Sequence, residues 1–552
     1  MTNTPASDVM GTFEQAIRVF EAGADYVRIS TPTRESTLGL RKIREELRLA
    51  GFDQPLVADI HFKPELALIA ARLVEKVRIN PGNYTSLPRK GKTDWTNNEY
   101  AAELERTRDN LAPLISVCRD YGTAIRVGTN AGSLSPRIVS RYGNTPEGLV
   151  QSTIEFLKIF EDLGFYQSVV SLKASNPLIM IRSYLLMAER MLKEGMSYPL
   201  HVGVTEAGEG RSGRIKSALG ICTLLKAGIG DTIRVSLSEP PEDEIPVARK
   251  IAAPFQQVFQ EMPAFGSSFK IPPFEWSHEP APPLPGGHKA IVIGKNQSKT
   301  EVKGKHSVVV YAGKESGESH EEYPLFSEKQ ISQGDASFHP EYNFVILNQE
   351  PGKDFGQLLK KVPGPVLIIE CSPDKLHGQI KNLRKLTGAE SINAGVLVML
   401  PLEGSDEEEV ISGLATGIGK ALLERKLRGI WAEAPNLPSK QTIINIGFDM
   451  LQAAGLRITQ TEFISCPTCA RTSFDLQDVL KEVKEKTSHL PGIKIAVMGC
   501  VVNGPGEMAD ADFGILGAGP GKVNIYRRSN PVLKNIDQHL AADRLLELIN
   551  TL

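Results

Sequence analysis

Three cysteines and one glutamate near the end of the chain have types and spacing that suit a metal centre. Cys466 and Cys469 stand three residues apart, Cys500 follows thirty-one residues later, and Glu507 comes after a Gly-Pro-Gly sequence. Two thiolates at this spacing reach one soft metal centre from a single turn, and a third from a distant loop adds to the set. Four thiolates saturate an iron–sulfur cluster, whereas three leave one iron open to a weaker ligand or a substrate. The pattern therefore predicts a catalytic metal site.

Structural zinc is the alternative for the same residues. A tetrahedral zinc site with three cysteines needs a fourth Cys or His, and His489 falls in the segment between the two cysteine groups rather than beside either. Glu507 is a carboxylate that suits a hard, open iron, and the glycines before it allow close approach of the backbone. The spacing favours iron–sulfur and leaves zinc open.

A second set of polar residues lies where the predicted strands of the first half of the chain end. Side chains spaced by two or four along a strand face the same side. Five of these strand ends carry a cation: Arg28, Arg78, Arg126, Lys173 and Arg234. Cations that converge on one cavity repel each other unless an anion lies among them, and Arg and Lys both suit phosphate oxygens. We therefore expect a diphosphate site, the alternative being a rim network of ion pairs.

Other polar residues share these strand ends and remain available for chemistry. Asn130 and Ser236 lie on the strands that carry Arg126 and Arg234. Asp59, His61 and Glu206 could handle hydroxyl groups or protons.

The elements that must position these residues alternate between short apolar runs and helical periodicity. The expected strands are 25–30, 56–61, 76–80, 124–130, 169–173, 200–205 and 232–237. Helical patterns fill the gaps, for example over 13–21, 38–49, 146–163 and 179–192. So regular a series predicts a parallel (β/α) barrel of the TIM type, with its active site at the carboxyl ends of the strands. Seven strands are one short of eight: either the first strand lies before Met1, which we expect, or another segment fills its place.

The second half of the chain is expected to hold two more domains. Residues 262–288 are rich in Pro, Gly and Ser and read as a linker. Strands are expected at 290–293, 307–311, 343–347, 365–369 and 395–399, and helices at 407–427 and 442–454. We expect a TIM-barrel domain over 1–260, an inserted α/β domain over 261–440, and a C-terminal α+β domain over 441–552 that holds the cysteines. Without clustered ligand residues, the middle domain is expected to be a scaffold or spacer.

Composition narrows the class of protein and its setting. A chain of 552 residues exceeds one ordinary core, and a formal net charge of −2 gives no field that would recruit nucleic acid or anionic membrane. The sequence lacks an apolar run of transmembrane length and a signal pattern. Cys118, Cys222 and Cys371 stand in apolar surroundings and are expected to be buried small hydrophobes. A reducing cytoplasm fits this cysteine usage best.

Motifs in the first and last domains together resemble one family, the 4-hydroxy-3-methylbut-2-enyl diphosphate synthases of the non-mevalonate isoprenoid pathway. The stretches that carry the resemblance are 57–62, 78–83, 125–134, 204–208 and 230–236 in the barrel, and 465–472 and 499–507 near the end. The section from about 260 to 440 resembles the extra domain of the family's longer form.

The resemblance implies a reductive enzyme with a [4Fe–4S] cluster on Cys466, Cys469 and Cys500 and Glu507 as a displaceable fourth ligand. Two electrons from reduced ferredoxin or flavodoxin would open 2-C-methyl-D-erythritol 2,4-cyclodiphosphate and expel a hydroxyl as water. The five cations would hold the diphosphate, with hydrogen bonds from Asn130 and Ser236. The residues that would orient the polyol or move protons are Asp59, His61 and Glu206.

The resemblance also implies a homodimer, because shorter relatives cover each barrel with the cluster domain of the partner. Two other classes of protein stay open on the residues alone. One is a phosphate-binding barrel with a zinc-stapled interaction domain, and the other is a different barrel enzyme, such as a pterin-type synthase, whose cluster is structural.

Overall fold

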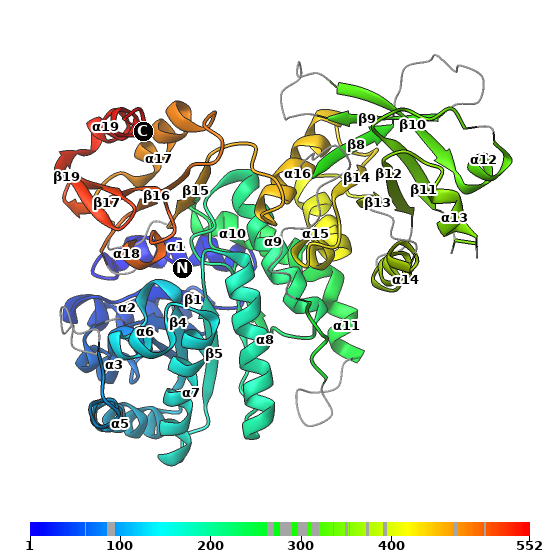
Figure 1. Ribbon diagram of the computed structural model, residues 1–552. Helices are drawn as coiled ribbons and strands as arrows, with labels where there is room; N and C mark the ends of the chain where they lie inside the picture. Colours follow the sequence, from blue (N-terminus) through cyan, green and yellow to red (C-terminus); the bar gives the residue numbers. More distant parts are fainter. Residues whose placement is uncertain are drawn as a thin grey trace. The chain divides into compact units, whose positions relative to one another are not determined.

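The computed structural model describes most of the chain (Figure 1). The described residues are 1–60, 62–84, 94–261, 270–275, 290–295, 306–311, 320–334, 336–347, 351–352, 354–370, 375–389, 395–466, 472–501 and 504–551. The predicted site residues His61 and Cys469 lie outside this set, as do Cys371 and most of the predicted linker.

The chain divides into two compact units. Unit 1 contains residues Met1–Ile271 and Gln460–Leu552, and unit 2 contains Pro272–Thr459. The barrel and the cysteine-bearing end of the chain therefore belong to one unit, although almost two hundred residues separate them in the sequence. Helix α16 (Lys440–Ala453) belongs to unit 2, where it contacts strands of that unit.

The first half of unit 1 is the predicted parallel barrel, and each of the seven expected strands is present at its expected place. The strands are β1 (Val27–Ser30), β2 (Leu56–Asp59), β3 (Lys76–Ile79), β4 (Ala124–Asn130), β5 (Ser168–Lys173), β6 (His201–Val202) and β7 (Thr232–Ile233). Strands β1 to β5 form one parallel sheet in chain order, β6 pairs with β7, and a bridge between Val170 and Leu200 joins the two groups. Strands β6 and β7 are much shorter than the apolar patterns at 200–205 and 232–237.

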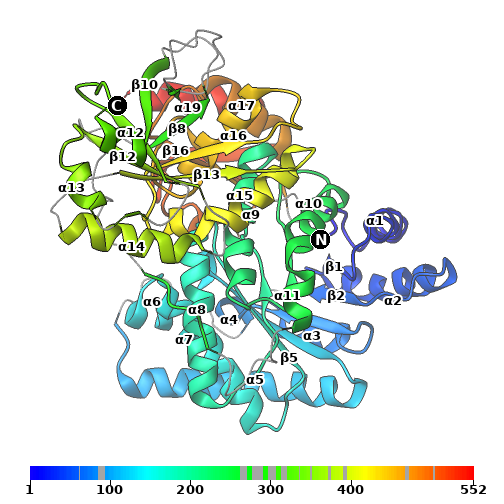
Figure 2. The same cartoon turned by 90° about the vertical axis from the view of Figure 1, so that its right-hand side faces the viewer.

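Helices cover the outer face of this sheet (Figure 2). They are α1 (Val9–Glu21), α2 (Arg34–Leu49), α3 (Pro64–Ala70), α4 (Pro81–Tyr84), α5 (Asn97–Tyr121), α6 (Pro136–Tyr142), α7 (Pro146–Asp162), α8 (Pro177–Glu194), α9 (Gly210–Lys226), α10 (Glu244–Ala252) and α11 (Gln256–Glu261). Local chemistry sets their ends. Thr33 caps α2 by a reciprocal capping box with Ser36, and α5 ends at Gly122, whose φ of 68° suits glycine.

A cavity of about 780 Å³ lies between β7 and β1 and continues into the barrel. Its wall includes Val19, Tyr26 and Phe255, and Arg28 and His201 also line it. Among the described residues, β1 pairs only with β2 and β7 only with β6, so the cavity lies where an eighth strand was expected.

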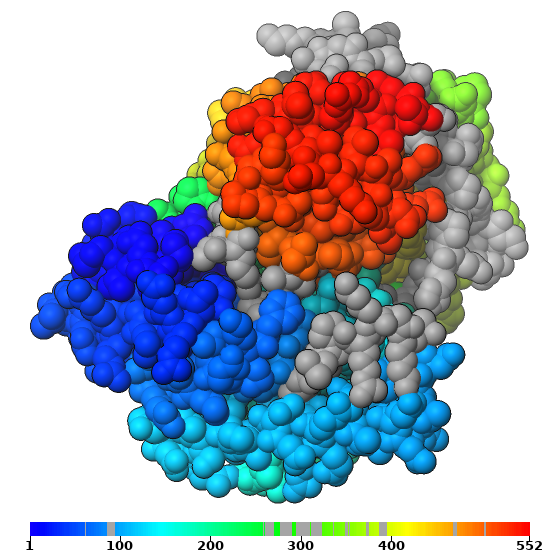
Figure 3. Space-filling model, turned by 90° about the vertical axis from the view of Figure 1, so that its left-hand side faces the viewer, coloured from blue at the N-terminus to red at the C-terminus, as the bar shows by residue number. Residues whose placement is uncertain are grey.

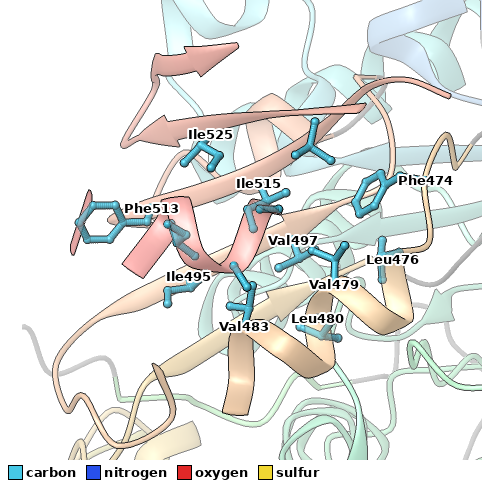
Figure 4. Packing of buried hydrophobic residues seen from close by; sticks show 14 of the residues in the cluster. Phe474, Leu476, Val479, Leu480, Val483, Ile495, Val497, Phe513, Ile515 and Ile525 are labelled. Atoms are coloured by element: carbon cyan, nitrogen blue, oxygen red, sulfur yellow. The ribbon is translucent and has the colours of Figure 1, made fainter. Parts of the chain in front are cut away.

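The C-terminal part of unit 1 is a five-stranded sheet with helices packed on it. Its elements are β15 (Glu462–Ser465), α17 (Leu476–Thr487), β16 (Lys494–Met498), α18 (Gly504–Glu507), β17 (Phe513–Gly519), β18 (Lys522–Arg527), β19 (Asn530–Asp537) and α19 (Ala541–Ile549). Strands β15, β16 and β17 are parallel, and β18 and β19 are antiparallel to their neighbours. Figure 4 shows Leu480 and Val483 of α17 facing Ile495 and Val497 of β16 in its apolar core. This core fixes the strand ends from which Cys466 and Cys500 emerge.

Unit 2 is a second, smaller barrel that closes on itself, which is more regular than the expected α/β insert. Its strands are β8 (Ile291–Lys295), β9 (His306–Tyr311), β10 (His320–Ser327), β11 (Asn343–Leu347), β12 (Pro365–Glu370), β13 (Gly395–Pro401) and β14 (Gly429–Glu433). Its helices are α12 (Glu328–Gln333), α13 (Phe355–Leu359), α14 (Leu376–Ala389), α15 (Glu407–Leu423) and α16. Apolar side chains such as Phe344, Ile368 and Trp431 form its core. Strands β10 and β14 were not among those expected from the sequence.

No helix among the described residues is both long and apolar enough to span a bilayer. Cys118 and Cys222 are buried, as their apolar surroundings indicated.

Candidate functional site

The barrel mouth brings together the five predicted cations. Arg78, Arg126 and Lys173 are 3%, 5% and 5% exposed, and Arg28 and Arg234 are partly buried. They come from five different strands or strand ends, at positions where the alternation of side chains turns them inward. The electrostatic influence of Arg28, Arg78, Arg126 and Arg234 on Lys173 shows that these cations share one space. The sequence thus located a convergent cationic site.

Two of these cations have a carboxylate partner: Arg234 lies 3.4 Å from Glu244, and Arg78 pairs more closely with Asp59. Arg78 Nη1 donates to Asp59 Oδ1 over 3.0 Å, and Arg78 Nη2 donates to the carbonyl oxygen of Gly128 over 2.7 Å. A Cβ atom at residue 128 would lie 2.3 Å from Arg78 Nε, so glycine is needed there for the guanidinium to fit. Asp59 is therefore the ion-pair partner of Arg78. This pair agrees with the alternative expectation, a network of ion pairs at the barrel rim.

Several buried donors in the mouth lack a hydrogen-bond partner among the described residues. They are Arg28 Nε, Arg126 Nε, Arg234 Nε, Ser30 Oγ and Ser236 Oγ. A buried donor without a partner costs free energy comparable to a lost hydrogen bond. Five such donors around one space are the signature of a site that binds an acceptor-rich ligand.

Burial and mutual repulsion act on the same cations. Burial lowers the pKa of Arg126 to about 10, with Arg78 as the next cause. Burial, then the charges of Arg234 and Arg126, hold the pKa of Lys173 well below its ordinary value. The pKa of Arg28 is likewise lowered by burial and by its neighbouring arginines, against the attraction of Asp59. An anion would relieve this repulsion.

His201 is a mouth residue that the sequence analysis missed. Its Nε2 lies 3.4 Å from Lys173 Nζ, and its Nδ1 lies 2.9 Å from Thr232 Oγ1. Tyr184 links the two strands beneath, because its hydroxyl donates to the carbonyl oxygen of His201 and accepts from the N–H of Leu172. The alternation that turns Gly203 and Thr205 inward also turns His201 inward, and this signal could have identified it.

Glu206 follows β6 and connects the barrel to the cysteine-bearing domain. It is 4% exposed and has a φ of 56°, a conformation that costs free energy in any residue but glycine. The next residue, Ala207, forms a parallel β-bridge with Ser465, which directly precedes Cys466. The strained backbone of Glu206 is therefore held by the strand that leads into the first cysteine.

Cys466 and Cys500 follow the carboxyl ends of the neighbouring parallel strands β15 and β16. Both are half-buried, and the N–H of Gly499 donates to Cys466 Sγ over 3.2 Å. A backbone donor aimed at sulfur suits a thiolate that carries charge, as in metal and cluster sites. The described residues hold no complete group of three metal-binding side chains, and the third predicted thiolate, Cys469, is outside them.

On one side of the mouth, several polar contacts join the barrel to the C-terminal domain. Ser238 Oγ lies 2.6 Å from Ser465 Oγ and donates over 3.4 Å to the carbonyl oxygen of Cys466. Lys216 Nζ, which is 6% exposed, pairs with Glu462 Oε1 at 3.0 Å. Figure 3 shows the barrel, in blue, beside the orange and red C-terminal domain of the same unit. These contacts join the strand before the first cysteine to the loop after β7 and to helix α9.

Glu507 contacts the opposite side of the mouth. Its Oε1 accepts from the N–H of Gly132 over 3.1 Å, and the N–H and hydroxyl of Ser175 also donate to it. Burial raises the pKa of Glu507 to about 7 against these hydrogen bonds. Gly506 is required for this approach, since a Cβ atom there would lie 2.0 Å from the carbonyl oxygen of Gly132. The loops after β4 and β5 thus form a receptor for this carboxylate.

The fold and the site define a (β/α)-barrel protein whose cationic mouth is covered by the cysteine-bearing domain of its own chain. Two family models match it: the GcpE TIM-barrel domain over residues 1–249 and the GcpE protein C-terminal domain over residues 462–551. The chain belongs to the GcpE family.

Curated relatives extend over the whole chain. A protein of Bacteroides fragilis named 4-hydroxy-3-methylbut-2-en-1-yl diphosphate synthase (flavodoxin) is 39% identical, covering 100% of this chain and 92% of its own. The chloroplastic, ferredoxin-named counterpart of Arabidopsis thaliana is 35% identical over 100% of this chain and 84% of its own. Among solved structures, a type I 3-dehydroquinate dehydratase of Clostridium difficile covers 46% of this chain and 89% of its own, with a TM-score of 0.28 and 11% identity, too low to support an argument.

Proposed function

We propose that the chain reduces 2-C-methyl-D-erythritol 2,4-cyclodiphosphate to 4-hydroxy-3-methylbut-2-enyl diphosphate, with electrons from ferredoxin or flavodoxin. The observation that carries this proposal is the group of five cations, three buried and two partly buried, beside the strands that lead to Cys466 and Cys500. A diphosphate-binding mouth and a thiolate site are thus parts of one unit. The names of the full-length relatives, which are flavodoxin- or ferredoxin-dependent enzymes, support the same reaction.

The reaction balances with two electrons and two protons, counted on fully protonated phosphates. The bond between the ring oxygen and the methyl-bearing carbon breaks, the neighbouring hydroxyl leaves as water, and a carbon–carbon double bond forms between the two carbons. The diphosphate stays attached at its other end. The protein must therefore hold a diphosphate while it supplies electrons and protons to the polyol.

Arg28, Arg126, Lys173 and Arg234 are proposed to hold the diphosphate. The Nε donors of the three arginines, which have no partner among the described residues, match the many acceptor oxygens of this group. Arg78, already paired with Asp59, contributes charge and holds the Asp59 carboxylate in place. Ser236 would add a hydroxyl donor, and Asn130, which is 7% exposed, an amide.

The residues that follow β15 and β16 fit an iron–sulfur cluster. Cys466 and Cys500 follow neighbouring parallel strands, and the Gly499 N–H aimed at Cys466 Sγ suits a ligating thiolate. We propose that Cys466, Cys469 and Cys500 hold a [4Fe–4S] cluster, which when bound supplies the electron entry point and a Lewis-acidic iron. Glu507 would be its displaceable fourth ligand.

Glu206 is the best-placed candidate to move a proton to the polyol. It is buried at the end of β6, and Ala207 fixes it to the cysteine-bearing strand. Asp59, engaged with Arg78, is proposed to orient a hydroxyl. His61 remains a prediction from the sequence.

The homodimer also stays a prediction. It was expected because a cluster domain must reach a barrel mouth, and this chain's own domain contacts its own mouth through Glu507 and Ser465. A single chain therefore has the parts for one site, and a dimer would serve another purpose. A cytoplasmic location, expected from the cysteine usage, is part of the same proposal.

The test is anaerobic reconstitution with iron and sulfide, followed by turnover of the cyclic diphosphate with a one-electron donor. The proposal expects a brown protein that forms the linear allylic diphosphate, and a Cys500→Ala variant that does not. A colourless protein that retains zinc would overturn the cluster assignment, because Zn²⁺ has a filled d shell. A cluster-loaded protein that leaves the cyclic diphosphate unchanged would overturn the reaction.

A further inference from the structure

His201 is a buried histidine in the barrel mouth to which the proposed reaction gives no role. Its side chain is 3% exposed, and its two ring nitrogens contact two different polar groups. Nε2 lies 3.4 Å from the amine of Lys173, and Nδ1 lies 2.9 Å from the hydroxyl of Thr232. An ordinary core histidine would need partners for both nitrogens, but it would not need to contact a buried cation.

We propose that His201 is a positioning residue that holds the Lys173 amine in the mouth and adapts to either protonation state of that amine. This inference rests on the proposed function, because it assumes that Lys173 binds the diphosphate. It adds His201 to the residues that take part in diphosphate binding, and it adds the uptake of a proton by Lys173 to that step.

The two tautomers of a neutral His201 match the two states of Lys173. When Nδ1 carries the proton, it donates to Thr232 Oγ1, and Nε2 accepts from an ammonium at Lys173. When Nε2 carries the proton, Thr232 donates to Nδ1, and Nε2–H donates to a neutral amine. Each state satisfies both ring nitrogens, so the change costs no buried hydrogen bond.

The charges around Lys173 explain why its amine would change its protonation state. It is faced by Arg28 of β1, Arg78 of β3, Arg126 of β4, Arg234 just after β7 and the imidazole of His201. Among the carboxylates, Glu244 lies 3.4 Å from Arg234, Asp59 pairs with Arg78, and Glu206 follows β6. The Met1 amine is also close. Burial and these cations lower the pKa values of both Lys173 and His201, which keeps the imidazole neutral.

A diphosphate reverses this balance because its negative charge favours the ammonium form of Lys173. Binding is therefore accompanied by proton uptake at Lys173, and affinity falls as the pH rises through the pKa of Lys173 in the free protein. Without an acceptor at His201 Nε2 the ammonium is less stable, so this fall begins at a lower pH.

Substitutions of His201 can remove its contacts with Lys173 and Thr232 one at a time. A glutamine places an acceptor near the position of Nε2 and so keeps the contact with Lys173. An asparagine reaches only the position of Nδ1 and keeps the contact with Thr232. A leucine removes both. Tyr184→Phe is the matched control, since it removes the hydroxyl that links Leu172 to His201 and leaves the contact of His201 with Lys173.

The experiment measures pyrophosphate binding by calorimetry from about pH 6 to pH 9, in buffers of different ionisation enthalpy, on the full chain. Loss of a charge-assisted hydrogen bond should weaken binding about tenfold in His201→Leu and His201→Asn, and His201→Gln should recover most of it. In His201→Leu the fall in affinity should begin at a lower pH. Pyrophosphate itself titrates in this range, so the difference between variants is the measured quantity.

The outcomes separate this inference from the proposed function. If the unaltered chain binds neither pyrophosphate nor the cyclic diphosphate, the proposed function fails. If the unaltered chain binds pyrophosphate and His201→Leu, shown folded by thermal unfolding, binds it with the same affinity and proton uptake, the role of His201 is overturned. It is also overturned if Tyr184→Phe weakens binding as much as His201→Leu, because the effect would then be structural.

Discussion

The carboxylate of Glu507 lies against the backbone of Gly132, with Oε1 3.1 Å from the nitrogen that donates to it. These residues are 375 positions apart, and they join the short helix α18 to the turn after β4. The contact is partly buried and involves a carboxylate that the family resemblance assigns to the cluster. It therefore marks the place where the two halves of the proposed site meet.

Gly506→Ala should separate these halves without removing a functional group. The added methyl would lie 2.0 Å from the carbonyl oxygen of Gly132, and backbone atoms cannot move aside cheaply. Overpacking of this kind costs about 1–3 kcal/mol. We expect reductive turnover to fall at least about tenfold while iron and sulfide content stay unchanged.

The control for this change is Gly519→Ala in the same domain, where an added methyl meets nothing within 4 Å. Its turnover and cluster content should match those of the unaltered chain. Equal activity of Gly506→Ala and Gly519→Ala would show that the contact between Gly506 and Gly132 is dispensable.

Arg126→Met should stabilise the ligand-free protein and weaken diphosphate binding. Arg126 is 5% exposed among four other cations, and its Nε has no partner among the described residues. Replacing a buried, repelled charge by an apolar side chain should raise the free energy of unfolding by roughly 1 kcal/mol. Calorimetry should show at least about a tenfold loss of pyrophosphate affinity. Arg18→Met, which alters an exposed cation on α1, should change neither quantity.

The pH dependence of the free energy of unfolding should show the destabilising effect of the buried charge of Lys173. Its folded-state pKa is lowered by burial and by neighbouring arginines. At low pH the Lys173 ammonium therefore destabilises the folded protein. The free energy of unfolding increases as the pH rises from the pKa of Lys173 in the folded protein toward its pKa in the unfolded chain. Urea unfolding of the ligand-free chain should show this gain, and Lys173→Met should lack it. A parallel pH dependence in both proteins would contradict the assignment.

The sequence was sufficient to locate the cations because a strand has a fixed alternation. Arg126 and Asn130 lie on a strand whose predicted bounds, 124–130, match the structure, and side-chain alternation turns them inward. Cys466 and Cys469 could also be found from the sequence, because C-x-x-C spacing is a local property of the chain. Features of this kind depend on neighbours along the chain.

Contacts between distant segments could not be found in this way. The pairing of Ser238 with Ser465 and of Glu507 with Gly132 depends on how one domain packs on the other. Strand β10 was missed because Glu321, Glu322 and Pro324 interrupt its apolar pattern. Strands β6 and β7 are shorter than their patterns because hydrogen-bonded pairing, rather than hydrophobicity, decides where a strand ends.

Ser238 and Ser465 should be energetically coupled. Their hydroxyl oxygens lie 2.6 Å apart, and both side chains are buried. A double-mutant cycle with Ser238→Ala and Ser465→Ala should give a coupling of about 1 kcal/mol in the free energy of unfolding, because each single change leaves one buried hydroxyl without its partner. Additive effects of the two changes would mean that the pair does not hold the domains together.

The most direct test of the account asks whether one chain holds a complete site. Cys500→Ala lacks a cluster ligand and Arg126→Met lacks a diphosphate ligand, so each variant should be inactive alone. Because Glu507 and Ser465 contact the barrel of their own chain, chains that carry the two changes separately should stay inactive after co-expression, reconstitution and assay with the cyclic diphosphate. Restored reductive turnover in the mixed sample would contradict this account, since it would require the cluster domain of one chain to serve the barrel of another.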